Sequence, residues 1–178
     1  MRNYTQLVIL CEDRQQEVFA RHFLVTCGIN RRRIRSLVAP RGLGSGEQYV
    51  RQHYPAEVRT YRAKRHHLQI ALVVLIDADT YPVTERLRQL EEELQHADLQ
   101  KRGNGEQIGL FIPKRNIETW IHYLQGETVN EIETYAKLTR EGDCKPAVAK
   151  LAKNRRQPLP QDAPNALQRA CSELSRIL

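Results

Sequence analysis

The run of seven aliphatic residues from Ile70 to Ile76 constrains the fold of this chain more than any other feature. It contains no polar residue, and it is bounded by Gln69 and Asp77. A helix that crosses a membrane needs about 20 apolar residues, so this run is too short to be one. A strand that is buried on both faces has this composition, and such strands lie in the middle of parallel sheets. We therefore expect an α/β protein with a central, mostly parallel sheet flanked by helices.

Shorter patterned segments complete the predicted fold. Further strands are expected over 6–11, 34–39 and 107–112. Helices are expected over 15–27, from 47 to about Pro55, over 85–101 and from 114 to 124. Beyond Gly126, three amphipathic stretches are each expected to be a short helix: 130–138, 145–153 and 165–178. The sequence thus predicts an α/β domain over 1–125 and a small helical C-terminal extension over 126–178 packed on it.

The composition of the 178 residues, 40% hydrophobic and 28% charged, is that of an ordinary folded protein. The first apolar stretch is too short for the core of a signal peptide, so we expect a cytoplasmic protein without membrane contact. The four cysteines are far apart, which favours free and mostly buried thiols over a zinc site or disulfides. His66 and His67 lie in a basic stretch without nearby acids, which favours surface histidines over metal ligands.

Acidic residues follow two of the predicted strands at the point where each strand ends. Glu12 follows the first strand, and Asp77 and Asp79 follow the aliphatic run. The carboxyl ends of parallel strands form the edge of a sheet at which ligands bind, so these side chains are expected to meet. Three carboxylates at one place repel one another unless a hard cation such as Mg²⁺ binds them. The alternative is that each is a helix cap or part of a solvated turn, but the joint pattern favours the metal site.

These motifs resemble those of the TOPRIM fold, the metal-binding domain of topoisomerases, primases and OLD-family nucleases. The family pattern is a Glu after the first strand, a glycine-containing turn after the second, and an Asp-x-Asp after a hydrophobic third. The corresponding residues here are Glu12, the loop 40–46, and Asp77 with Asp79. The segment 112–120, Ile-Pro-Lys-Arg-Asn-Ile-Glu-Thr-Trp, is similar to one in small stand-alone TOPRIM-like proteins of bacteria, several of them linked to phage defence.

The resemblance covers about residues 1–125 and implies a TOPRIM-like Rossmannoid fold that binds Mg²⁺ or Mn²⁺. It also implies a nuclease with a role in phage defence. An ATPase or another defence-system protein is the expected partner of such a nuclease. The chain departs from the family pattern at Asp13, where such nucleases often have glycine.

Charged residues also follow the strand expected over 107–112. Because Pro113 ends that strand, Lys114, Arg115 and Glu118 are expected to open a helix at the same edge of the sheet. Basic groups are unfavourable at a helix N-terminus, which indicates that an anion is expected there. Lys114 or Arg115 would then neutralise a phosphate, and Glu118 would complete the metal shell or orient a water molecule. The alternative for Glu118 is a favourable interaction with the dipole of the helix.

Positive charge is concentrated between residues 21 and 65, where eleven Arg or Lys stand against two acids, a surplus of 11 − 2 = 9. That surplus exceeds the net charge of +7 of the whole chain. Ten of the eleven are Arg, whose planar guanidinium can bind a phosphate through two hydrogen bonds. A solvated basic face is the alternative, but we predict a nucleic-acid-binding surface. Its expected residues are Arg31, Arg32, Arg33, Arg35, Arg41 and, from the later motif, Arg115.

The residues together predict a Mg²⁺-dependent phosphodiester hydrolase, a nuclease acting on DNA or RNA. Glu12, Asp77 and Asp79 are the expected metal ligands, and Glu12, Lys114 and Glu118 the expected catalytic residues. The second hypothesis is a non-catalytic partner or regulator that keeps the same fold and binds nucleic acid or protein.

Two other enzyme classes fit the sequence less well. The glycine-rich loop 40–46 lacks the Gly-Lys-Ser/Thr end of a P-loop, so ATP hydrolysis is not expected. The segment from Asp77 to Thr80 approaches the Asp-x-Asp-x-Thr signature of haloacid dehalogenases. Here, however, the threonine follows the second aspartate directly.

Overall fold

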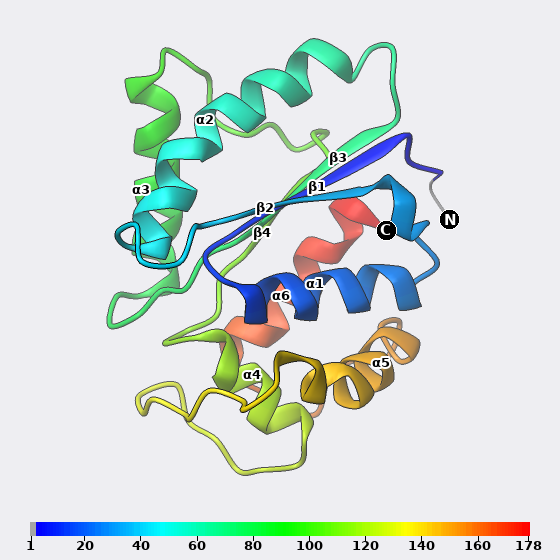
Figure 1. Cartoon of the computed structure of the whole chain (residues 1–178), viewed down its shortest axis with the longest axis vertical. Helices are drawn as coiled ribbons and strands as arrows, with labels where there is room; N and C mark the ends of the chain where they lie inside the picture. Colours follow the sequence, from blue (N-terminus) through cyan, green and yellow to red (C-terminus); the bar gives the residue numbers. More distant parts are fainter. Residues whose placement is uncertain (1–2) are drawn as a thin grey trace.

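The computed structural model describes residues 3–178, which form a four-stranded sheet with helices on both faces (Figure 1). The strands are β1 (Gln6–Cys11), β2 (Ile34–Val38), β3 (Ile70–Leu75) and β4 (Ile108–Phe111). The helices are α1 (Arg14–Thr26), α2 (Gly46–Lys64), α3 (Val83–His96), α4 (Ile117–Leu124), α5 (Lys145–Lys153) and α6 (Asn165–Ile177). Two short 3₁₀ helices are η1 (Arg31–Arg33) and η2 (Glu141–Cys144).

All the strands are parallel, in the order β2-β1-β3-β4, so the predicted α/β Rossmannoid fold is confirmed. Every residue of β3 is buried, as the aliphatic run requires. β1 pairs with β3 in a register that places Leu10 opposite Val74. Because the two strands run in the same direction, Glu12 and Asp77 leave the sheet at the same edge.

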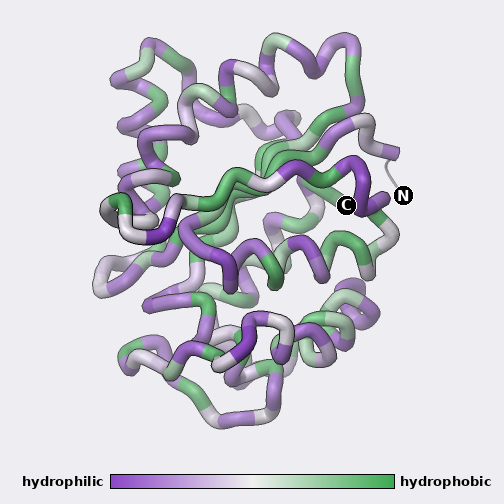
Figure 2. The backbone as a smooth tube through the Cα atoms, in the orientation of Figure 1, coloured by the Kyte–Doolittle hydropathy of each residue, from purple (hydrophilic) through white to green (hydrophobic). Residues whose placement is uncertain are grey.

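Two hydrophobic clusters enclose the sheet, whose strands are the apolar centre of the molecule (Figure 2). α2 and α3 cover one face with Val50, Val58 and Leu90. α1, α4, α5 and α6 lie on the other side (Figure 1). Val148 of α5 and Leu167 of α6 belong to the same cluster as α1 and the sheet, so the segment 126–178 shares the core of the α/β unit.

The expected end of the second helix near Pro55 is wrong, because α2 continues through this proline to Lys64. Proline inside a helix costs about 3 kcal/mol, since it removes a backbone hydrogen bond and crowds the preceding turn. The helical face that includes Tyr54, Val58 and Tyr61 is buried against the sheet on both sides of Pro55. Burial of such side chains contributes roughly 1.5–3 kcal/mol each, which outweighs the cost of the proline.

The helix expected over 130–138 is also wrong, because this segment is irregular. The Asn130 side chain accepts hydrogen bonds from the backbone N–H groups of Ile132 and Glu133, which fixes a turn in place of a helix. Ile132 is 82% exposed, so the apolar positions of this segment do not bury the face that would stabilise a helix.

The outer edge of β4 is covered by an ion pair between Arg102 and Glu173. Glu173 Oε2 accepts the backbone N–H of Leu110 at 3.1 Å, and Arg102 donates to the carbonyl of Ile108 at 2.8 Å. The two side chains also pair with each other at 2.5 Å. These contacts satisfy backbone groups that an uncovered edge strand would leave free to pair with another chain.

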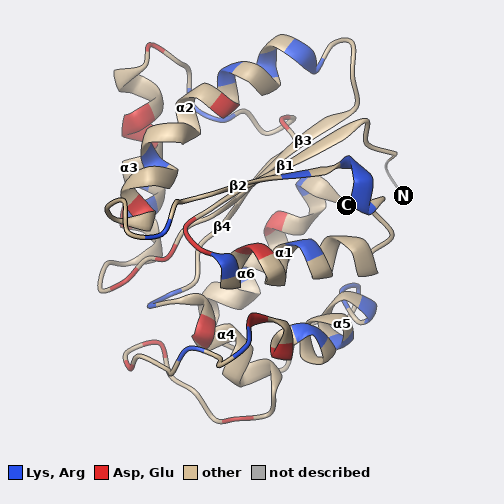
Figure 3. Ribbon diagram, viewed as in Figure 1, with Lys and Arg blue, Asp and Glu red and all other residues tan. Residues whose placement is uncertain are grey.

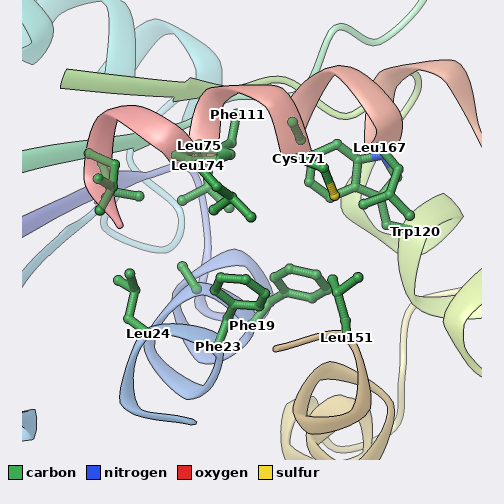
Figure 4. Close-up of a pocket in the computed structure, with 14 residues that line it drawn as sticks. Phe19, Phe23, Leu24, Leu75, Phe111, Trp120, Leu151, Leu167, Cys171 and Leu174 are labelled. Carbon is green, nitrogen blue, oxygen red and sulfur yellow. The ribbon is translucent and has the colours of Figure 1, made fainter. Parts of the chain in front are cut away.

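A small apolar cavity of about 50 Å³ lies between α6 and α1 (Figure 4). Phe19 and Phe23 approach it from α1, and Leu167 and Cys171 approach it from α6. Within residues 3–178, the neighbouring Trp120 Nε1 has no hydrogen-bond partner. A cavity lined by carbon offers too few hydrogen bonds to hold water, so this one is a dry gap in the core.

The cysteines are free thiols, and Cys11, Cys27 and Cys144 are buried, as expected. None of the helices within residues 3–178 combines the length and the apolar character that crossing a membrane demands.

Replacing Glu173 by Gln is expected to lower the free energy of unfolding by about 1 kcal/mol at neutral pH. Burial alone would raise the pKa of Glu173, but hydrogen bonds from Arg102 and from the Leu110 N–H hold it below its ordinary value. A carboxyl group with a lowered pKa stabilises the fold above its unfolded pKa of 4.5, and this contribution is lost as the pH falls through the folded value. Urea denaturation of both proteins across the acid range measures the difference, which should shrink below about pH 4. A difference independent of pH would contradict this account.

Candidate functional site

Glu12 and Asp77 meet at the carboxyl edge of the sheet, as the sequence predicts. Glu12 Oε1 accepts the backbone N–H of Asp77 at 2.5 Å. Burial raises the pKa of Glu12 to about 8, against the lowering effect of that hydrogen bond. Burial also raises the pKa of Asp77, and the charge of Glu12 raises it further. The Glu12 carboxyl group is therefore close enough to Asp77 to disfavour its ionisation.

Gln16, in the first turn of α1, holds both acidic residues in place. It is fully buried, its Nε2 donates to Asp77 Oδ1 at 2.9 Å, and its Oε1 accepts the backbone N–H of Glu12 at 3.0 Å. The Asp13 side chain caps α1 by accepting the Gln16 backbone N–H at 2.9 Å. Sequence reasoning missed Gln16, because Asp-x-x-Gln is also an ordinary signature of a helix start.

The glycine-rich loop packs directly against Glu12. A Cβ at Gly46 would lie 2.8 Å from the Cβ of Glu12 and 2.9 Å from its carbonyl oxygen, so only glycine permits this approach. Ser45 caps α2 at the same point by accepting the Gln48 backbone N–H. The N-terminus of α2, with its free backbone N–H groups, is thereby brought to the acidic residues.

A pocket of about 420 Å³ opens beside Glu12. Its walls come from the turn after β1, the glycine-rich loop, α4 and the segment 137–141. The charged side chains that line it are of both signs, as the mixed colours at this end of the sheet indicate (Figure 3). They are Glu12, Asp13, Glu118 and Glu141 on the acidic side and Arg14, Arg41 and Lys137 on the basic side.

Glu118 contributes a carboxyl group to this pocket from the first turn of α4. Its side chain is buried, and within residues 3–178 its Oε1 has no hydrogen-bond partner. Burial raises its pKa. A buried carboxyl oxygen without a partner is costly, and a hydrogen-bond donor placed beside it would remove that cost.

Asp79, the third predicted metal ligand, is engaged in an ion pair. Its backbone is in the left-handed region with φ 53°, and its side chain is 56% exposed. Its Oδ2 pairs with Arg86 at 3.1 Å. In the part of the chain that the structure describes, no three His, Cys, Asp or Glu side chains are grouped as ligands of one ion. The arrangement thus brings Glu12 and Asp77 together and leaves Asp79 beside them in an ion pair.

Arg86 is a buried cation that sequence reasoning missed. Its side chain is 2% exposed, and it donates to the carbonyl of Asp77, to Glu47 Oε2 at 2.7 Å and to Asp79 Oδ2. These hydrogen bonds tie the turn after β3 to α2. The signal lay in the spacing, because Arg86 continues the buried row formed by Leu90 and Leu94 at intervals of four residues.

Lys114 and Arg115 do not open a helix, so that expectation is wrong: α4 begins at Ile117. The backbone N–H of Ala78 donates to Pro113, and that of Asp79 donates to Arg115, so the two chain segments remain paired beyond β3 and β4. This pairing, together with the left-handed backbone of Arg115 at φ 67°, replaces the first turn of a helix.

The charged groups of these two residues bind nearby chain segments. Lys114 Nζ donates to the carbonyls of Thr80 and Tyr81, and Arg115 donates to Thr134 Oγ1. Their predicted roles toward a phosphate stay predictions.

The arginines predicted to bind nucleic acid lie at two opposite ends of the sheet. Arg41 and Arg115 are at the carboxyl edge, where Arg41 pairs with Glu141 at 3.2 Å. The others precede β2 or lie near its start, at the amino edge: Arg31, Arg32, Arg33 and Arg35.

Comparisons of the chain with protein-family models, with curated proteins and with solved structures found no match. The chemistry of the site therefore has to be inferred from its residues. Mg²⁺ and Mn²⁺ fit them, because one or two carboxylates completed by water suffice for Mg²⁺. Glu12 and Asp77 are such a pair, and the unpartnered Glu118 oxygen lies in the adjoining pocket.

Replacing Arg86 by Met is expected to lower the free energy of unfolding by about 3 kcal/mol, because it leaves buried acceptors without their cation. Urea denaturation measures the change. Arg88→Met is the matched control, because Arg88 lies on the same helix with a side chain 56% exposed, and its loss should cost less than about 0.5 kcal/mol. Equal losses for the two variants would show that Arg86 has no special role.

Replacing Glu12 by Gln is expected to stabilise the metal-free protein by about 2 kcal/mol at pH 8 or above, with little effect near pH 5. The pKa of Glu12 rises from an ordinary value of 4.5 to about 8 on folding. An acid with a raised pKa stabilises the fold fully below its unfolded pKa, and this stability is lost as the pH rises through the folded value. Denaturation in EDTA across this range provides the measurement. The account fails if the variant is no more stable than the natural protein at pH 8.

Proposed function

We propose that the protein is a Mg²⁺- or Mn²⁺-dependent phosphodiester hydrolase that acts on DNA or RNA and has a TOPRIM-like fold. The observation that carries this proposal is the contact between Glu12 and the Asp77 backbone at the carboxyl edge of a parallel sheet. Ligands of such sheets bind at this edge. Two neighbouring acids in a partly buried place are unfavourable for folding, and a shared divalent cation removes the repulsion.

The chain's own residues would prepare the site for such a reaction. Gln16 and the Asp77 N–H fix the oxygens of the two acids that would hold the ion. When bound, the ion supplies a Lewis acid that lowers the pKa of a coordinated water and offsets the charge of the phosphate. Glu118 Oε1, which is buried without a partner among residues 3–178, would accept a proton of the attacking water.

The substrate phosphate would be bound by basic groups of the pocket. Arg14 and Lys137 line it, and the N-terminus of α2 presents its backbone N–H groups nearby. Lys114 would act through the turn that it holds at Thr80 and Tyr81, so we assign it a positioning role. The volume of about 420 Å³ is within the range of pockets that bind small organic ligands, which suits a single nucleotide unit.

The second candidate function is a non-catalytic partner or regulator that binds nucleic acid or protein. The ion pair between Asp79 and Arg86 favours it, because it occupies one of the expected metal ligands. In either case we place the protein in the cytoplasm. The resemblance of the segment 112–120 supports a role in phage defence beside a partner ATPase or another defence-system protein.

Replacing Asp77 by Asn is expected to reduce Mg²⁺- or Mn²⁺-dependent cleavage by at least about 100-fold, because the site loses a carboxylate that holds the ion. Nicking of a supercoiled plasmid and cleavage of labelled single-stranded DNA and RNA provide the measurement. Asp162→Asn is the matched control, because Asp162 lies in an exposed loop, and it should retain full activity. If the natural protein cleaves none of these substrates with either ion but binds nucleic acid, the second candidate function replaces the first.

A further inference from the structure

A second charged surface lies at the amino edge of the sheet, at the opposite end from Glu12. η1 ends immediately before β2, and α2 ends a few residues before β3. Because the strands are parallel, both of these basic segments reach the same edge. The name "amino-edge surface" is used for the cations of these segments, of β2 and of the end of α5. They are Arg31, Arg32, Arg33, Arg35, Lys64, Arg65, Arg155 and Arg156.

Hydrogen bonds connect the segments that carry these residues. Arg33 donates to the carbonyl of Thr5 at 3.4 Å. The Thr5 N–H in turn donates at 2.7 Å to the carbonyl of Gln69, the residue before β3. Arg155 and Arg156 line a shallow pocket together with Cys27, at the end of α1 and close in sequence to η1. Figure 3 shows η1, the end of α2 and the end of α5 on the same side of the molecule, with lysine or arginine in each.

The charge of this surface is largely uncompensated. Arg31, Arg32, Arg35 and Lys64 are exposed, and within residues 3–178 no ion pair joins them to an acid. Glu106 lies beside the end of α2, where it is buried in ion pairs with Arg62 and Arg65. Exposed cations of one sign raise the local concentration of polyanions, and each phosphate that they bind releases counterions.

The surface and the pocket are too far apart to bind the same phosphate. β2 has five residues between them, and a strand rises about 3.3 Å per residue, so the separation is roughly 15–20 Å. Adjacent phosphates along one strand of B-DNA are about 3.4 Å apart along the axis, so this distance corresponds to about five nucleotides.

We infer that the amino-edge surface is a separate binding site for the phosphodiester backbone of nucleic acid. It holds a strand or duplex several nucleotides away from the carboxylate pocket. Binding at this surface does not depend on the proposed hydrolase activity. The contribution of the surface to cleavage of long substrates does rest on that activity.

The composition of the surface favours nucleic acid over a membrane. Seven of its eight cations are Arg, and the guanidinium group binds phosphate in a bidentate geometry. A protein segment that binds a lipid surface combines its cations with several exposed apolar side chains. Of the large hydrophobic side chains exposed in the described part of the chain, only Leu68 adjoins this surface, whereas Leu43, Tyr81 and Ile132 lie elsewhere.

The test replaces Arg31, Arg32 and Arg35 together by Gln. Binding of labelled single-stranded and duplex DNA of about 20 nucleotides is measured in EDTA at several salt concentrations. Because the variant lacks three cations that bind phosphate, the slope of log K against log salt should flatten by about 2–3, and affinity at physiological salt should fall at least about tenfold. The matched control replaces Arg88, Lys145 and Arg169 by Gln, which removes the same charge from other elements, and it should bind like the natural protein. Melting temperatures of both variants verify the fold.

A second measurement separates binding at this surface from the chemistry at the pocket. The triple variant should hydrolyse a p-nitrophenyl nucleotide ester as the natural protein does, whereas its KM for a strand of about 20 nucleotides should rise about tenfold. If the natural protein hydrolyses neither substrate, the hydrolase proposal fails. The binding experiment in EDTA still decides whether the amino-edge surface binds nucleic acid. Unchanged DNA binding by the triple variant overturns the inference, as does an equal loss in the control. Binding to phosphatidylserine vesicles or to an acidic polypeptide in place of DNA also overturns it.

Discussion

The partial burial of two acidic residues side by side is the constraint on which the rest of this structure depends. Glu12 and Asp77 reach the same edge because β1 and β3 pair in parallel, and desolvation of both would be unfavourable without nearby donors. The donors are the Asp77 backbone N–H, the Gln16 amide and, at the Asp77 carbonyl, the buried Arg86. Gly46 lets the N-terminus of α2 approach the same point. The first turn of α1, the start of α2 and the start of α3 are thus all organised around one acidic pair.

The acidic pair could be predicted from the sequence, but the residues that support it could not. A seven-residue aliphatic run followed by Asp77 has few structural solutions, and a parallel sheet brings Glu12 to the same edge. Gln16 acts through a contact with Asp77, which is 61 positions away in the sequence. Arg86 acts through a contact with Glu47, which is 39 positions away. Nothing in the local pattern distinguishes such a glutamine from a helix cap. The same limit explains Pro55, where burial on both sides of the residue overrides its local preference.

The distribution of the arginines shows how position in a sequence can mislead about position in a parallel fold. Arg35 and Arg41 are six residues apart and form part of one basic stretch in the sequence. Arg35 is near the start of β2 and Arg41 follows its end, so they stand at opposite ends of the sheet. Each helix that follows a strand then returns the chain to the amino edge, which is why the end of α2 joins η1 there. The basic stretch is therefore divided between the pocket and the surface opposite to it.

The C-terminal segment contributes to the pocket as well as to the core. α5 and α6 are anchored by buried side chains, and exposed ion pairs are one of the contacts that hold the segment 137–141 beside the pocket. These pairs join Lys137 to Asp13 at 3.5 Å and Glu141 to Arg41 at 3.2 Å. Exposed ion pairs contribute little, commonly less than about 1 kcal/mol each. Leu138 also packs against the core, and Gln15 Nε2 donates to the carbonyl of Glu141 at 3.2 Å, so packing and a backbone contact fix this wall of the pocket more than its ion pairs do.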